Sequence, residues 1–362
     1  MKRKRWLAVI AVFFLLWESA QAASLPGQVI EDLPPQAEVL LEELDEQSLP
    51  HELLLEGLEN LWAALVEELE SALKKPLKGV VSLLAVVLLC ALAEACFRTT
   101  GEKAYVRAIS LAGALAITLI TVGDVEWLMG QSVETIDSLH ALSKTILPVL
   151  SAAVAASGGA VSAGFRHVAG VVFADLMITV IHKLLVPLVY FQVIASAAAA
   201  MFSQESLSKV AKMLSRLSTW ILTGMLALYT GYLTLIGAMT ASADRISLQV
   251  ARTAMGAVPV VGGIISDAAG TVLAGAEVLK NAVGVIGMLS VLAVCLIPFL
   301  ELVIQYLLYK LAAILAGVLG PSRLTGLIEG LGGAFGLILG MTGACAMLLL
   351  LSLILSVTVV TL

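Results

Sequence analysis

The sequence predicts an all-α polytopic membrane protein with about six transmembrane helices and two re-entrant or broken helical hairpins in a tandem internal repeat. The chain is 60% hydrophobic and 13% charged, with a mean hydropathy of +1.01. Soluble domains are roughly 45–50% apolar and about 25% charged. No soluble core could cover this much apolar surface, so the bulk of the chain belongs in a lipid bilayer.

A glycine-rich apolar stretch occurs twice, at 148–164 and at 259–275, with an offset of 111 residues and six of 17 positions identical. The same offset pairs Pro187 with Pro298, and it pairs a set of small and apolar residues of one predicted span with those of another. Several matches at one offset indicate an internal repeat. The paired residues are Leu111, Gly113, Leu115 and Ala116 with Leu222, Gly224, Leu226 and Ala227.

The N-terminal residues 1–23 are typical of a secretory signal peptide. A basic start is followed by an apolar run of 12 residues and by the small-x-small site Ala20-Gln21-Ala22. An uncleaved first anchor is the alternative. Under either interpretation, residue 24 onward lies outside the cytoplasm.

Residues 24–76 form an acidic extracytoplasmic segment. Between 31 and 70 there are 13 acidic residues and no Lys or Arg. Leucines at three- and four-residue steps predict an acidic amphipathic helix from 52 to 75. Such a helix suits the protein's own outer face or a partner better than an anionic lipid surface, whereas 24–50 can also be a solvated spacer.

The remaining chain divides into spans and loops by charge and hydropathy. Within the repeats, 124–145 and 244–252 are expected to be surface segments, and each glycine-rich stretch precedes a long apolar run. The expected units are a first transmembrane helix with a basic loop (77–103), repeat 1 (104–201), a basic cytoplasmic linker (202–216), repeat 2 (217–316), and a loop with a C-terminal transmembrane helix (317–362).

The positions of basic residues predict the topology. With the N-terminus outside, the loops at 98–107, 203–216 and 317–330 should all be cytoplasmic. A full span at 146–164 would place the basic loop 203–216 outside. Both glycine-rich stretches are therefore interpreted as re-entrant or broken helices, which are tolerated where protein surrounds them. Parallel repeats of this kind occur in some transporters.

No motif predicts catalysis or a cofactor. The chain lacks a His-Glu-x-x-His helix, a phosphate-binding loop and a Gly-x-Ser-x-Gly turn, so it is expected to be no enzyme and to hold no cofactor or metal. It has no basic patch for nucleic acid. The four cysteines lie in apolar segments without metal-ligand spacing and are interpreted as small hydrophobes.

Ionisable and polar residues within apolar runs are the candidate functional residues, because each is costly in lipid. They lie in the first long run, in the second glycine-rich stretch and in the second long run: Asp175, His182, Lys183, Asp267, Glu301 and Gln305. Two interpretations stay open, a polar lining of a transport path and interhelical hydrogen bonding or contact with a partner. Lys183 and Lys310 can also extend along apolar surface to reach water.

Glycines on the last span form two successive Gly-x-x-x-Gly steps, at Gly332, Gly336 and Gly340. Small residues at this spacing allow a second helix to approach closely. Pro187 and Pro298 are expected to kink their helices rather than to act as moving hinges.

The chain resembles the stage III sporulation protein AE family of endospore-forming bacteria. The resemblance covers the whole chain and is most specific at 259–272 and at Lys280-Asn281-Ala282-Val283-Gly284, with support from 152–162. It implies a multi-pass protein of the mother-cell membrane around the forespore. It also implies a channel or secretion-like complex with a separate cytoplasmic ATPase and ring-forming outer proteins.

Three functions are therefore expected as alternatives. The first is a non-enzymatic subunit that lies in the lipid bilayer and helps form or gate that channel. Such a subunit can also form a homo-oligomer. The second is a self-sufficient secondary transporter, which the repeat and the buried charges favour. The third is a membrane scaffold without a conduit, whose acidic outer helix recruits partners.

Overall fold

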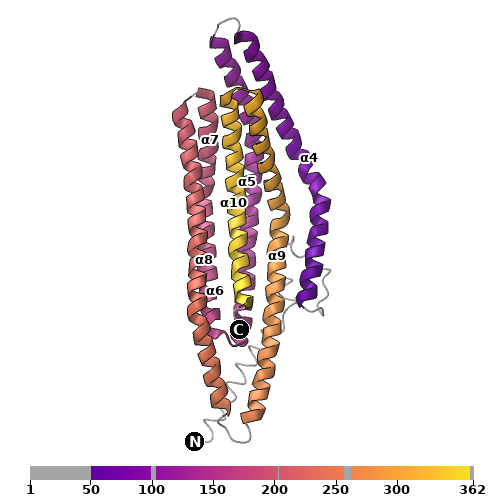
Figure 1. The fold of residues 1–362 in the computed structure, drawn as a ribbon, viewed down its shortest axis with the longest axis vertical. Coiled ribbons are helices and arrows are strands. Elements are labelled where there is room, and N and C mark those ends of the chain that lie inside the picture. Colours follow the sequence, from indigo (N-terminus) through magenta and orange to yellow (C-terminus); the bar gives the residue numbers. More distant parts are fainter. Residues whose placement is uncertain (1–49, 99–102, 203, 257–261, 359–362) are drawn as a thin grey trace.

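The computed structural model describes residues 50–98, 103–202, 204–256 and 262–358. These residues form long helices packed side by side along one axis (Figure 1). The elements in chain order are α4 (Pro50–Arg98), α5 (Lys103–Ala156), α6 (Ala160–Val180), the π-helical turn η1 (Ile181–Leu185), α7 (Val186–Phe202), α8 (Glu205–Gly256), α9 (Gly262–Leu319) and α10 (Ser322–Thr358).

Within the described part of the chain, six helical segments are long and apolar enough to cross a membrane. They overlap the six spans expected from the sequence, with α6, η1 and α7 counting as one segment. They extend over Ala72–Phe97, Ala104–Ala156, Ala160–Phe202, Ser206–Gly237, Gly270–Leu319 and Ser322–Val357. With 54 and 58 residues, α5 and α9 are each about 80–90 Å long at 1.5 Å per residue. This exceeds the roughly 30 Å hydrocarbon core of a bilayer, so the bundle extends beyond it.

The helices run alternately up and down the bundle (Figure 1). The α4–α5, α7–α8 and α9–α10 turns lie at one end, and the α5–α6 turn lies at the other. α10 is central and packs on α5, α6, α7, α8 and α9, whereas α4 packs on α9 and α5 at the periphery. The turns near the three basic stretches therefore share one end.

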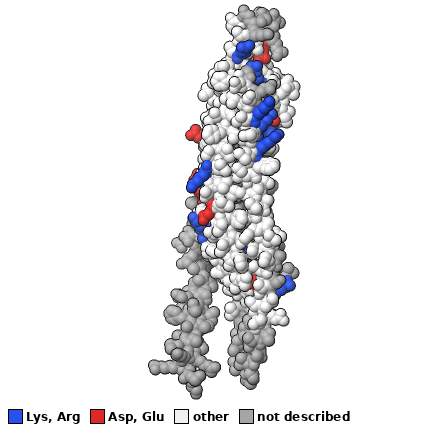
Figure 2. All heavy atoms as spheres, turned by 90° about the vertical axis from the view of Figure 1, so that its left-hand side faces the viewer, with Lys and Arg blue, Asp and Glu red and all other residues white. Residues whose placement is uncertain are grey.

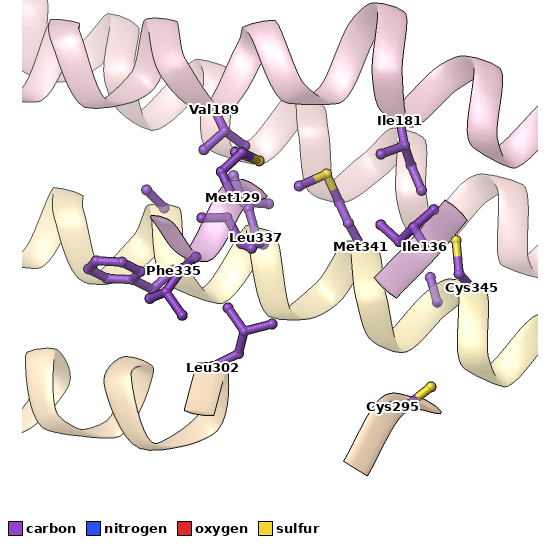
Figure 3. Close-up of a cluster of buried hydrophobic side chains, with 14 of the residues drawn as sticks. Met129, Ile136, Ile181, Val189, Cys295, Leu302, Phe335, Leu337, Met341 and Cys345 are labelled. Carbon is purple, nitrogen blue, oxygen red and sulfur yellow. The ribbon is translucent and has the colours of Figure 1, made fainter. Parts of the chain in front are cut away.

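Buried hydrophobic side chains form one continuous cluster along α10 (Figure 3). Phe335, Leu337 and Met341 of α10 belong to this cluster together with Leu302 of α9 and Met129 of α5. Close packing of this kind leaves few voids larger than a water molecule. The part of the bundle around these side chains is thus filled.

The expected surface helix at 124–145 is wrong, because this segment is the continuous middle of α5. Leu128, Met129, Ile136, Leu139 and Leu142 are all buried. Their three- and four-residue spacing makes one apolar stripe, which α10 and α6 cover. The charged residues Glu126, Glu134 and Asp137, which favoured a surface position, are exposed on the side of the bundle.

Two further boundaries differ from the expectation. The segment 244–252 belongs to α8, which continues to Gly256. The expected loop 317–330 is much shorter, since α9 ends at Leu319 and α10 begins at Ser322. Pro321 explains the sharp turn, because proline is favoured at a helix start and not within a helix.

The first glycine-rich stretch forms the α5–α6 corner. α5 ends at Ala156, and the chain turns through Gly158, whose φ of 99° favours glycine. The N–H of Gly159 donates to the carbonyl of Val154 at 2.9 Å and closes the last turn of α5. The helix is broken here. The insertion of this corner into a membrane stays a prediction.

The second glycine-rich stretch lies partly outside the described residues, and α9 begins within it at Gly262. The two prolines of the long runs differ in their surroundings. Pro187 follows the π-helical turn η1 at the start of α7, and π-helical turns commonly mark bends. Pro298 lies within the α-helix α9. The predicted signal peptide and the acidic residues 24–49 lie outside the described residues.

Candidate functional site

Asp175 and His182 each contact a residue of α5, and the two contacts lie next to one another. Nε2 of His140 lies 3.1 Å from Oδ1 of Asp175, and Nε2 of His182 lies 3.2 Å from Oδ1 of Asp137. α5 and α6 are antiparallel across their corner, so residues before the corner meet residues after it. Two histidines and two aspartates thus form a charged cluster on one side of the bundle, hereafter the His–Asp cluster.

The His–Asp cluster lies at the outer surface of this chain and not in its interior. The side chains of Asp137 and Asp175 are 53% and 56% exposed. Lys183, one residue beyond His182 in η1, is also exposed. Ionisable groups on the first long run therefore face outward from the bundle.

The position of this cluster along the bundle axis follows from the contacts that His140 and a nearby residue of α5 make with α10. His140 borders a small cavity that is also bordered by Cys345 and Leu349. One turn before Asp137, on the side of α5 that faces α10, the hydroxyls of Ser132 and Thr342 lie 2.6 Å apart. No charged residue occurs in α10 from 331 onward. The cluster is thus level with the uncharged middle of a predicted membrane span.

Gln305 of α9 is buried in a separate polar contact. Its Nε2 donates to Oδ2 of Asp124 at 3.2 Å, and the hydroxyl of Tyr309 donates to Thr121 at 3.0 Å. Glu301 is half-buried one turn from Gln305 on the same helix. These groups join α9 to α5 through interhelical hydrogen bonds.

Tyr306, the residue after Gln305 in the sequence, points to a different neighbour. Its ring lies against α10 beside Gly336, and Nζ of Lys310 lies 5.8 Å from the ring centroid. Asp267 belongs to the first turns of α9, and its side chain lies outside the described residues. The candidate residues of the two long runs are therefore not brought together into one lining.

The glycines of α10 lie against neighbouring helices. A Cβ at Gly332 would lie 3.4 Å from Cβ of Tyr309, and one at Gly336 would lie 2.9 Å from the Tyr306 ring. At Gly340 the neighbour is Leu222 of α8, 3.2 Å away. The first two positions bring α10 close to α9, and the third brings it close to α8.

Asp244, which was expected on a surface segment, caps α6 from α8. Its carboxylate accepts the backbone N–H groups of Val161 and Ser162 at 3.0 and 3.2 Å, as well as the Ser162 hydroxyl. The first N–H groups of a helix need such acceptors. Arg166, also buried, donates to the carbonyl of Leu355 in α10. This polar cluster fastens the α5–α6 corner to α8 and α10.

Asp137 and His140 are visible in the sequence as polar residues of 124–145, but their polarity favoured a surface segment. Their spacing of three residues places them on one helical face, as does the spacing of seven between Asp175 and His182. Only the antiparallel register about the corner shows that the two faces meet. Asp244 carried no sequence signal, because its partners are 82 and 83 residues away.

Comparison with known proteins gives a single consistent result. A model of the family described as stage III sporulation protein AE matches residues 47–360. A protein named stage III sporulation protein AE from Bacillus subtilis (strain 168) is 30% identical over 188 residues, which cover 52% of this chain and 47% of that protein. The match thus spans about half the length of that curated relative. No solved structure matches the chain.

Proposed function

This chain belongs to the stage III sporulation protein AE family and has a role in sporulation, and we propose that it serves as a membrane subunit of a channel or secretion-like complex. The complex would join the mother cell and the forespore, and the subunit would help form or gate its conduit. The proposed subunit is not an enzyme. A separate cytoplasmic ATPase would supply energy.

The His–Asp cluster is the observation that carries this proposal. It exposes Asp137, Asp175 and Lys183 on the side of the bundle, level with the uncharged part of α10. Charged side chains that face lipid are costly, and they normally face a bundle interior, a partner or a water-filled cavity. The bundle of one chain therefore needs a second polypeptide or a conduit against α5 and α6.

The packed interior supports an assembly rather than a pore within one chain. Leu302, Phe335 and Met341 lie in a buried apolar cluster at the axis (Figure 3). A conduit between subunits would instead use the exposed ionisable groups as part of its wall. Asp175 and Asp137 would line this conduit, and His140 and His182 would hold them in place.

The proposed location is the mother-cell membrane around the forespore, with the N-terminal segment outside the cytoplasm. Under this topology the end of the bundle that carries Arg107, Lys212 and Arg323 is cytoplasmic, in line with the excess of basic residues there. The α5–α6 corner then lies on the extracytoplasmic side. The glycine-rich stretches are proposed to enter the assembly there as broken helices of a duplicated unit.

Neutralisation of the cluster tests the proposal. Asp175→Asn and Asp137→Asn keep side chains that can accept a hydrogen bond from histidine but remove the negative charge. We expect the protein to accumulate in the membrane and to stay in its complex, while sporulation efficiency falls by about 100-fold or more, the scale of a lost catalytic or transport function. Glu301→Gln and Asp267→Asn extend the same test to the second repeat.

A membrane scaffold is the second candidate function. The hydrogen bonds of Gln305 with Asp124 and of Asp244 with α6 are structural contacts. If each neutralised variant fails to accumulate or to assemble, the scaffold function replaces the conduit. A self-sufficient transporter would require that the purified chain alone move a solute across a liposome membrane.

A further inference from the structure

A cavity of about 670 Å³ opens at the end of the bundle that carries the basic turns, between α7, α8, α9 and α10. Four cationic side chains line it, and Glu329 is the one carboxylate among the described residues that line it. The cations come from three helices: Lys212, Arg216, Lys310 and Arg323. Figure 2 shows blue side chains gathered toward this end of the molecule. The excess of positive charge suits an anionic ligand.

The inner wall of this basic cavity offers a hydrogen-bonding group that is still available. Gln192 of α7 is 2% exposed, and its Nε2 donates to the carbonyl of Gly330 at 3.2 Å. Its buried Oε1 has no hydrogen-bond partner among the described residues. Buried polar atoms are nearly always satisfied by protein or bound groups. A ligand hydroxyl within the cavity would satisfy this oxygen.

A second cavity, of about 590 Å³, continues from the first along the bundle and shares Ser215, Lys310 and Gly333 with it. Apart from Lys310, none of the described residues that line it is charged. Glycines at positions 333, 336, 340 and 343 of α10 lie along it, and Phe299 and Met347, both partly exposed, border it. It is therefore an apolar groove that opens to the side of the bundle.

The two cavities together match an amphipathic ligand. Along α10 the groove extends from Gly333 to Met347, about 20 Å at 1.5 Å per residue. One leaflet contributes about 15 Å of the hydrocarbon core, so the groove is long enough for an acyl chain. Basic pockets between transmembrane helices on the cytoplasmic side are typical sites of anionic lipid headgroups.

We propose that this protein binds one anionic phospholipid, with the headgroup phosphate among Lys212, Arg216, Lys310 and Arg323 and an acyl chain in the groove between α8, α9 and α10. Gln192 would accept a hydrogen bond from a headgroup hydroxyl. The proposal rests on the bundle spanning a membrane and not on the conduit. Such a lipid would fasten α8 to α10 at the side away from α4.

Native mass spectrometry of the purified full-length chain tests this proposal. The chain is exchanged into micelles that contain equal amounts of phosphatidylglycerol and phosphatidylcholine, and retained lipid is counted. We expect one phosphatidylglycerol, preferred by about tenfold or more over phosphatidylcholine. The double variant Lys212→Gln, Arg323→Gln should weaken retention by about 25-fold, since each cation near a membrane surface contributes about fivefold.

Matched variants separate the two parts of the site. Lys209→Gln removes an exposed charge of α8 that does not line the cavity and should leave retention unchanged. Gly340→Leu fills the groove and should release the lipid, whereas Gly224→Leu places the same side chain at an open position. Because Gly340→Leu also approaches Leu222, the charge variants carry the test independently.

Three results would overturn the proposal. The first is equal retention of the two lipids by the wild-type chain. The second is displacement of phosphatidylglycerol by millimolar inorganic phosphate together with undiminished retention in Gly340→Leu, which would leave a phosphate site without an acyl groove. The third is a wild-type dimer in which Thr223→Cys, at the groove rim, crosslinks to its copy, because a second chain would then occupy the groove.

Discussion

Asp244 shows how single residues hold distant helices in place. It is 7% exposed, and its carboxylate accepts two backbone N–H groups at the start of α6, 82 and 83 residues earlier in the chain. The same carboxylate places a negative charge near Arg166, which is buried four residues after Ser162. A surface prediction for Asp244 follows naturally from its charged neighbours in sequence. The contact of Asp244 with the start of α6 depends on the geometry of the α5–α6 corner. The residues next to Asp244 in the sequence therefore could not predict it.

Asp244→Ala should therefore destabilise the folded bundle. It leaves two helix N–H groups without an acceptor and a buried Arg166 without its neighbouring carboxylate, a loss of about 3 kcal/mol. Thermal unfolding of the detergent-solubilised chain, followed by circular dichroism, measures the change. Ser247→Ala, at an exposed position on the same helix, is the control and should unfold like the wild type. Equal melting temperatures for both variants would contradict the capping role.

At the scale of helices, hydropathy and charge predicted the transmembrane spans but not the lengths of the helices that contain them. The polar residues of 124–145 suggested a boundary after Gly123, yet α5 continues to Ala156. Its buried stripe at Leu128, Ile136 and Leu142 finds its partner only in α10. The expected boundary at Pro76 was wrong as well, since α4 continues through this proline.

The glycine face of α10 leads to a prediction at the same scale. Gly336→Leu places a side chain where a Cβ alone would lie 2.9 Å from the Tyr306 ring. We expect a loss of about 1–3 kcal/mol from overpacking between α9 and α10. Gly224→Leu, where no neighbouring atom lies within 4 Å of the place that a Cβ would take, should be neutral. Thermal unfolding of both variants in detergent measures the change in stability. Equal melting temperatures for Gly336→Leu and Gly224→Leu would contradict close packing of α9 against α10.

At the scale of the whole molecule, the composition alone predicted a helical membrane protein, and charge distribution predicted which turns share an end. The structure places the α4–α5, α7–α8 and α9–α10 turns together (Figure 1). The candidate functional surface could not be predicted in the same way. Asp175 and His182 were identified as candidates, but their partners Asp137 and His140 and their exposure depend on how α5 and α6 pack.

The shared end also leads to a topology prediction. Ser206, exposed at the start of α8, should be cytoplasmic together with the other basic turns. In a variant with Cys96→Ser, a single Ser206→Cys should resist a thiol reagent that cannot cross the membrane and should react after the cells are permeabilised. Modification in intact cells would reverse the proposed topology.

We propose that another subunit covers the charged side of α5 and α6, and site-specific photocrosslinking is the sharpest test of this contact. Thr179 is exposed one turn from both Asp175 and His182. Leu228, 69% exposed in an uncharged stretch of α8, is the matched lipid-facing control. In sporulating cells, a photoreactive residue at position 179 is predicted to crosslink to another polypeptide, with little or no crosslinking from position 228. Equal protein crosslinking from both positions, or none from position 179, would contradict the account.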